Sequence, residues 1–256
     1  MERIIFWCEF PNKINWKKLN ELLKKNNLQV NTYISCKNKK DFLQKKKFSS
    51  KNINILGAWP VLPKNKGYWF SGFTEKKDID LLKEFKGINI KIDIEPPIPK
   101  KGSLNIWLTK YFLKRQKNKK YLHEVIKEIS KKSNVILSTF PCPNFAVKRY
   151  GFFKDKSLTY NFMYYSTFIP KILRPLYRLY YRLFMLTKDK DKTYFALGLI
   201  SKGIFNNEPV YKSVKEFRKD IKFLKKNKAK HFVIFRLGSL LERKNPNEWI
   251  KAIKEI

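Results

Sequence analysis

The sequence predicts an α/β protein, a (β/α)8 TIM barrel that forms a single domain over residues 1–256. Two observations support this fold class. Eight short runs rich in β-branched and aromatic residues occur along the chain, and the segments between them carry apolar residues at three- and four-residue spacing. Strands alternating with amphipathic helices over about 250 residues fit a closed barrel more economically than a doubly wound sheet.

The predicted strands and helices follow one another in the order that such a barrel requires. The strands begin near Ile4, Gln29, Ile53, Ile88, Asn134, Tyr160, Thr193 and His231. The clearest helical segments span residues 15–27, 77–87, 121–132 and 214–227, and a final one spans 245–256. Asn15 and Ser213 precede two of these segments as N-caps, and Gly87 ends another.

Two of the predicted connections are longer than the rest. One begins at Pro96, after the fourth strand, and the other follows the sixth strand as a basic, aromatic insertion around residues 167–192. Long connections at the carboxyl ends of barrel strands usually shape the functional site. We therefore expect the site at this end of the barrel.

The chain is strongly basic, with 57 Lys and Arg against 21 Asp and Glu and a formal net charge of +36. Abundant Lys, Asn, Ile, Phe and Tyr also result from AT-rich codons, without selection for a ligand. The functional interpretation is a negatively charged partner, such as an anionic membrane leaflet, a phosphorylated glycan carrier or a nucleic acid. Composition does not choose between these interpretations.

The scarcity of histidine and the spacing of cysteine exclude several kinds of site. His123 and His231 are the two histidines, which argues against a histidine-rich metal centre and restricts catalytic triads. Cys8, Cys36 and Cys142 form no C-x-x-C pair, so neither a disulfide framework nor a zinc ribbon is indicated. We expect no metal and no organic cofactor.

The first residues of the chain do not have the pattern of a secretion signal. Their apolar run is short, Glu2 and Glu9 flank it, and no cleavage-site pattern follows. The sequence also lacks a run of about 18 uncharged apolar residues. We expect a cytoplasmic protein, with peripheral attachment to the inner membrane face as the alternative.

The fourth predicted strand carries the most informative polar residues. Lys91, Asp93 and Glu95 share one parity, so they point to one face of the strand, with neighbours roughly 6–7 Å apart. The isoleucines between them would face the helices, which directs the polar residues into the barrel. Pro96 and Pro97 then hold Glu95 extended at the rim, where catalysis normally occurs in this fold.

These three charged groups suggest an acid catalyst. Lys91 should keep Asp93 ionised, and that negative charge beside a partly buried Glu95 should raise the pKa of Glu95. A carboxyl group that holds its proton near neutral pH can act as a general acid.

The D-x-E at the end of the fourth strand resembles the family 18 glycoside hydrolases, the chitinases and endo-N-acetylglucosaminidases, whose fuller motif is D-x-x-D-x-D-x-E. The resemblance implies a retaining, substrate-assisted reaction. Glu95 would protonate the glycosidic oxygen, and Asp93 would orient the acetamido group of the substrate to attack the anomeric carbon. It also implies a substrate that contains N-acetylhexosamine.

The sixth strand resembles the same family in part. The family pattern M-x-Y-D is met by Met163, Tyr164, Tyr165 and Ser166. The resemblance implies that Tyr165 hydrogen-bonds the acetamido group and that Met163 lies beside the substrate.

The chain departs from the family pattern at several positions. Ile88 and Lys91 replace the two earlier aspartates, Ser166 replaces the aspartate of the sixth strand, and no Trp occurs on the eighth. Family 25 muramidases also carry a D-x-E on a barrel strand. The alternatives are a buried ion network of Lys91, Asp93 and Glu95, or a relic that binds glycans without cleaving them.

Aromatic and polar residues near other strand ends are the further candidates for substrate contacts. Trp59, Tyr68 and Trp69 follow the third strand or lie at its end, and their rings can stack on the apolar faces of sugars. Glu9 ends the first strand and Thr139 the fifth, where substrate hydroxyls could be bound.

Residues 168–188 form a second unusual segment, a basic amphipathic helix. Arg174, Arg178 and Arg182 repeat every four residues among apolar side chains. These arginines would meet lipid phosphates or other anions. The apolar residues expected in the lipid interface are Leu173, Leu176, Leu183 and Phe184. The alternative is an ordinary barrel helix with its apolar face inward.

The sequence therefore predicts a glycoside hydrolase-like barrel that acts on a glycan or glycoconjugate. The first alternative is a catalytically inactive glycan-binding or membrane-associated barrel. The second is a nucleic-acid-binding protein, which only the net charge supports because no RNA or DNA motif is recognised. The sequence makes no prediction of oligomeric state.

Overall fold

The computed structural model describes residues 2–98, 111–205 and 207–256. In this part of the chain, hydrogen-bonded parallel strands follow one another in the order β1 to β8, and β8 pairs with β1, so the barrel is closed. The predicted (β/α)8 fold class is confirmed. The strands are β1 (Ile4–Cys8), β2 (Val30–Cys36), β3 (Ile53–Pro60), β4 (Ile90–Asp93), β5 (Val135–Thr139), β6 (Thr159–Tyr164), β7 (Thr193–Leu197) and β8 (His231–Phe235).

Helices occupy the connections between the strands, and one follows the last strand. They are α1 (Trp16–Lys25), α2 (Lys39–Lys45), α3 (Lys76–Asp80), α5 (Lys119–Ser130), α6 (Asn144–Lys148), α7 (Arg174–Leu186), α8 (Val214–Lys226) and α9 (Pro246–Lys254). Among the described residues, no helix is long and apolar enough to cross a membrane.

The chain divides into two compact units. The first unit comprises Met1–Ile34, Lys45–Leu56 and Asn161–Ile256, and the second comprises Ser35–Gln44 and Gly57–Tyr160. The extent of the domain, given by the sequence as residues 1–256, stays a prediction.

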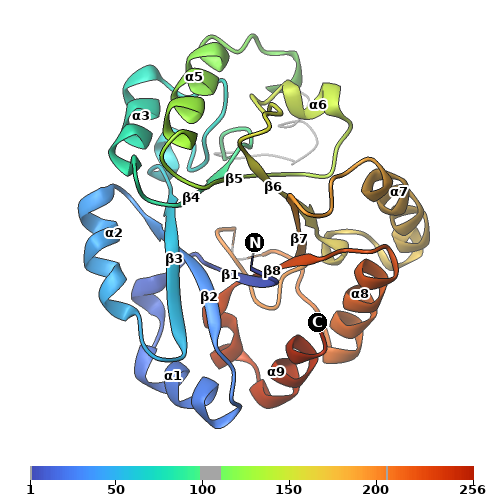
Figure 1. The fold of residues 1–256 in the computed structure, drawn as a ribbon. Coiled ribbons are helices and arrows are strands. Elements are labelled where there is room, and N and C mark those ends of the chain that lie inside the picture. Colours follow the sequence, from blue (N-terminus) through green and yellow to red (C-terminus); the bar gives the residue numbers. More distant parts are fainter. Residues whose placement is uncertain (1, 99–110, 206) are drawn as a thin grey trace. The chain divides into compact units, whose positions relative to one another are not determined.

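In the first unit, β1 pairs with β2 and β8, and β7 pairs with β8. Helices α1, α8 and α9 lie outside these strands (Figure 1). The strands read as almost continuous apolar runs because both of their faces are buried, as parallel strands require. Phe217 of α8 packs on Trp249 of α9 with ring centroids 5.5 Å apart.

In the second unit, β4 pairs with β3 and with β5. The outer layer includes α3, the 3-10 helix Leu81–Phe85 and α5 (Figure 1). Leu122, Ile126 and Ile129 of α5 are fully buried at the spacing of one helix face. Each such side chain contributes roughly 1.5–3 kcal/mol when it leaves water.

Local signals at the helix ends agree with the sequence. The Asn15 side chain accepts a hydrogen bond from the Lys18 N–H at 3.0 Å, and Ser213 accepts one from the Glu216 N–H at 3.3 Å. Gly87 has φ +84° with open space around its α-carbon, so the left-handed backbone there requires glycine for conformation and not for packing.

The structure describes the two long predicted connections to different extents. The connection after β4 falls partly on residues 99–110, which lie outside the described residues. The segment expected as a basic, aromatic insertion contains α7, which stands between β6 and β7 as the helix of a β/α unit. Pro175 lies at the first turn of α7, where proline is well tolerated.

Candidate functional site

The polar side chains of β4, and that of Glu95 just beyond its end, are almost completely buried. Lys91, Asp93 and Glu95 are 1%, 2% and 3% exposed and alternate with the isoleucines of the strand. Lys91 Nζ donates to Asp93 Oδ2 at 2.6 Å. Asp93 Oδ1 lies at the same distance from the ammonium group, yet no donor among the described residues is aligned with it for a hydrogen bond.

The Lys91 ammonium group also lies over an aromatic ring of β3. Its Nζ is 3.5 Å from the centroid of the Trp59 ring, a close cation–π contact. The Trp59 indole is 2% exposed, and its Nε1–H has no hydrogen-bond partner within the described part of the chain. A buried indole N–H normally finds an acceptor, so this donor has unused capacity for a ligand.

The backbone at Glu95 is fixed from both sides. On one side, Phe70 N–H donates to Asp93 O and Glu95 N–H donates to Phe70 O, each at 3.1 Å, so the segment after β3 pairs with the end of β4. On the other side, Ile94 N–H donates to a β5 carbonyl at 2.8 Å, and the Thr139 hydroxyl donates to Ile94 O at 3.0 Å. These bonds hold Glu95 extended beyond the strand.

The other aromatic candidates of this unit lie in the segment after β3. Tyr68 and Trp69 are buried, and their rings meet edge to face with centroids 5.7 Å apart. The backbone turns sharply ahead of them, with positive φ at Gly67 and Tyr68. The same turn brings Phe70 alongside β4, so the aromatic segment and the carboxylates are positioned together.

Met163 and Tyr165 belong to the first unit. Met163 is buried, while Tyr165 is half-buried and stacks on Phe168 with centroids 5.8 Å apart. Tyr164, between them, packs on Tyr177 of α7, so its side chain faces the helices. Met163, the neighbour of Tyr164 on β6, therefore has the opposite parity.

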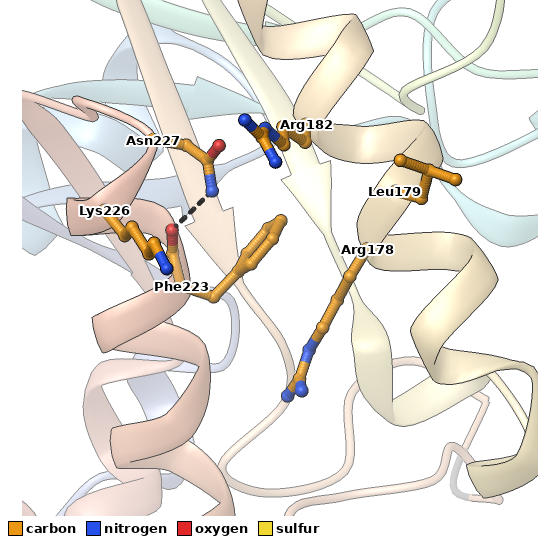
Figure 2. A pocket seen from close by; sticks show the side chains of 6 residues that line it. All are labelled: Arg178, Leu179, Arg182, Phe223, Lys226 and Asn227. Carbon is orange, nitrogen blue, oxygen red and sulfur yellow. Dashed lines mark hydrogen bonds between the residues drawn. The ribbon is translucent and has the colours of Figure 1, made fainter.

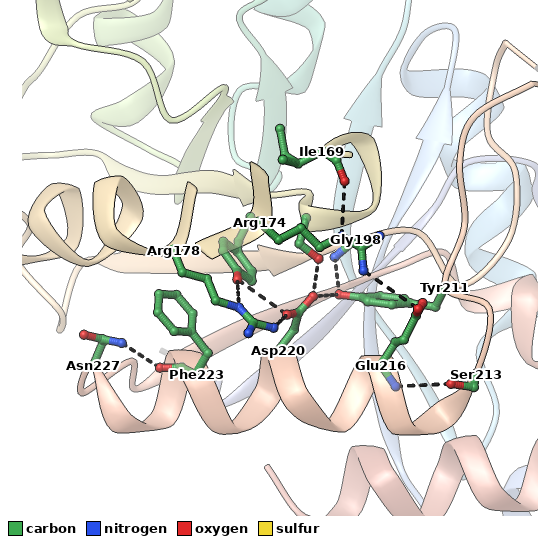
Figure 3. Close-up of polar contacts among 12 residues, drawn as sticks. Ile169, Arg174, Arg178, Gly198, Tyr211, Ser213, Glu216, Asp220, Phe223 and Asn227 are labelled. Carbon is green, nitrogen blue, oxygen red and sulfur yellow. Dashed lines mark hydrogen bonds and ion pairs between the residues drawn. The ribbon is translucent and has the colours of Figure 1, made fainter. Parts of the chain in front are cut away.

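Ser166, which stands where family 18 has an aspartate, hydrogen-bonds a carboxylate from another element. Its hydroxyl donates to Asp220 of α8, which is 2% exposed. Asp220 also accepts from Tyr211 at 2.9 Å and from Arg178 at 3.1 Å (Figure 3). Burial, and secondarily the nearby Asp220, raise the pKa of the Tyr211 phenol well above its usual range.

Glu9 lies beside a second carboxylate that the sequence analysis did not identify. A methyl group added at Gly203 would lie 3.0 Å from Glu9 Oε2 and 3.1 Å from Glu208 Oε1. Glu208 accepts from the N–H groups of Gly203 and Phe205 at 2.8 and 2.9 Å. Both glutamates are buried. No sequence spacing predicts that Glu9 and Glu208 are neighbours, because the path of the loop after β7 brings them together.

The three arginines of α7 have different environments. Arg178 pairs with Asp220, and Arg174 lies 3.8 Å from Glu216 and donates to Ile169 O (Figure 3). Arg182 is exposed and has no carboxylate partner among the described side chains.

No group of three or more His, Cys, Asp or Glu side chains in the described ranges could hold a metal ion. Both histidines contact backbone carbonyls instead. His123 Nε2 lies 2.7 Å from Gly151 O, and its ring stacks on Phe153, while His231 Nδ1 lies 3.0 Å from Glu2 O.

Two solved structures have a fold similar to that of this chain. The glycoside hydrolase domain of PgaB (BpsB) from Bordetella bronchiseptica has a TM-score of 0.61 at 10% identity, over 96% of this chain and 97% of that one. An endocellulase from Pyrococcus horikoshii, solved in complex with cellotetraose, has a TM-score of 0.51 at 12% identity, over 91% and 84%. No family model and no curated protein sequence matches this chain. Membership of family 18 stays a prediction.

Proposed function

We propose that the protein is a glycoside hydrolase that cleaves an N-acetylhexosamine-containing glycan by substrate-assisted acid catalysis. The observation that carries the proposal is the arrangement at the end of β4, where Asp93 and a rigidly held Glu95 lie on the same strand parity. The similarity in fold to glycoside hydrolases supports it.

In the proposed reaction, Glu95 gives its proton to the glycosidic oxygen as the bond to the anomeric carbon breaks. The acetamido oxygen of the substrate attacks that carbon, and the leaving sugar departs as an alcohol. Water, giving a proton to Glu95, then attacks the anomeric carbon from the face opposite the acetamido oxygen. The bond between that oxygen and the anomeric carbon breaks, the acetamido group is regenerated, and configuration is retained.

Asp93 would accept the acetamido N–H and stabilise the positive charge that develops on that group. Its Oδ1 has no aligned donor in the described residues, which leaves it able to accept one. Lys91 would hold the carboxylate in place through Oδ2. The unused Trp59 N–H would bind a substrate oxygen. The assistance by Tyr165 that the family 18 resemblance implies stays a prediction.

The decisive experiment compares Glu95→Gln with the parent on N-acetylglucosamine oligosaccharides. We expect Glu95→Gln to abolish turnover while oligosaccharide affinity and unfolding midpoint stay the same, because the amide cannot donate a catalytic proton. Glu124→Gln, an exposed carboxyl change on α5, is the matched control and should keep full turnover. Turnover of Glu95→Gln equal to that of the control would refute the role of Glu95.

A second candidate is a barrel that binds glycans without cleaving them. The observation that favours it is the Lys91–Asp93 ion pair, which is almost fully buried and already satisfies one carboxylate oxygen. Oligosaccharide binding that Trp59→Phe weakens, together with no turnover by the parent protein, would support this candidate over the hydrolase.

A further inference from the structure

The outward face of α7, together with the 3-10 helix Lys171–Leu173 that precedes it, is apolar. The exposed apolar residues of this segment, which we call the leucine face, are Ile172, Leu173, Leu176, Leu179, Leu183 and Leu186. Ile172 is 85% exposed and Leu186 is 72% exposed. The inward face of α7 already buries Tyr181, Phe184 and Met185. Phe184, expected from the sequence to enter a lipid interface, packs on Phe162 instead.

A contiguous row of exposed leucines on a helix is a typical sign of an interaction surface. Helix α7 has apolar residues on both its inward and its outward face. Packing against the barrel explains the inward face only. The leucine face therefore needs a different partner.

A basic cavity opens beside the leucine face. It has a volume of about 310 Å³ and is lined by Arg178, Leu179 and Arg182 from α7 and by Phe223, Lys226 and Asn227 at the end of α8 (Figure 2). Arg178 is neutralised by Asp220. Arg182 and Lys226 are exposed and have no acidic partner in the described part of the chain, so the cavity carries unbalanced positive charge.

The charge decides which partner fits. A second copy of the chain would bring the leucine faces together only by also bringing together the cations beside them, on molecules of net charge +36. A nucleic acid would match the cations but offers no apolar surface for the leucines. An anionic bilayer matches both, since its phosphates attract Lys and Arg and its acyl boundary receives leucines.

We propose that α7 docks the protein on anionic phospholipid membranes. The leucine face enters the interface, and a lipid phosphate occupies the cavity between Arg182 and Lys226. Guanidinium and ammonium groups are well suited to phosphate oxygens. Arg178 stays paired with Asp220 and fixes the helix to α8, so docking requires no refolding.

The experiment is flotation of the full chain with phosphatidylcholine vesicles, with and without phosphatidylserine. We expect partition onto the phosphatidylserine vesicles only. Arg182→Gln with Lys226→Gln should reduce the partition coefficient about 30-fold, which corresponds to about 1 kcal/mol for each cation near an anionic surface. Lys24→Gln with Lys25→Gln on α1 removes the same net charge and should reduce partition less than about threefold.

The apolar contribution has its own variants. Leu176→Asn with Leu183→Asn changes two exposed side chains, so folding is preserved and binding should be lost. Three results would overturn the proposal: equal losses for the two charge-removing pairs, unchanged binding in the leucine variant, or a dimer in sedimentation that the leucine variant converts to monomer. Binding to oligonucleotides in preference to the vesicles would overturn it as well.

Discussion

Lys91 of β4 extends its ammonium group over the indole ring of Trp59 on the neighbouring strand, with Nζ 3.5 Å from the ring centroid. The contact joins a cation, an aromatic platform and, through the same ammonium group, the Asp93 carboxylate in one buried cluster. The proposed reaction and the stability of the barrel would therefore depend on the same side chains.

The Lys91–Asp93 pair should show strong energetic coupling. Lys91→Met leaves a buried carboxylate without its cation and should lower the free energy of unfolding by about 3–5 kcal/mol. Lys91→Met combined with Asp93→Asn removes the charge of both partners and should recover much of that loss. Urea unfolding of the parent, both single variants and the double variant measures the coupling. Additive losses would show that the two residues do not stabilise each other.

The hydroxyl of Thr139 should matter for both stability and turnover. Thr139→Val removes the donor to Ile94 O, leaves a buried carbonyl without that bond, and should cost about 1–3 kcal/mol of unfolding free energy. It should also lower kcat, because the backbone before Glu95 loses one of its restraints. Thr139→Ser keeps the hydroxyl and should retain most of both. A Ser variant as impaired as the Val variant would assign the effect to packing.

His123 should make the protein less stable in mild acid. Burial lowers the pKa of its imidazole below the usual value of 6.5, and nearby Lys119 and Lys127 act in the same direction. The unfolded chain then binds more protons as the pH falls through about 6.5, so this residue's contribution is present above that pH and is lost below it. Urea unfolding at successive pH values should show a smaller decline for His123→Gln. Parallel declines would contradict the prediction.

Much of the fold follows from local sequence patterns. Runs of β-branched and aromatic residues locate strands β1 to β8, since a strand buried on both faces is mostly apolar. Asn15 and Ser213 mark helix starts in the sequence because each caps its helix through a hydrogen bond to a residue only three positions later. Side-chain parity on β4 is equally local.

The contacts missed by the sequence join residues far apart in the chain. Ser166 meets Asp220 through the packing of α8, and Glu208 comes beside Glu9 through a loop. The return of Phe70 along β4 depends on the turn at Gly67. No periodicity in the sequence encodes such contacts, because the path of a loop decides them. The exposure of the leucine face was also ambiguous, since both faces of α7 are apolar.

The Asp220 carboxylate has a consequence for how the first unit would sit on a surface. It gathers donors from the end of β6, from α7 and from the segment before α8, so α7 cannot swing away without breaking several bonds at once. If the membrane-binding helix were joined by a flexible linker, the rest of the first unit could reorient freely above the lipid. Because these bonds hold α7 in place, the proposed contact with lipid would fix the orientation of the strands of the first unit relative to the membrane, including the end of β6 before Tyr165.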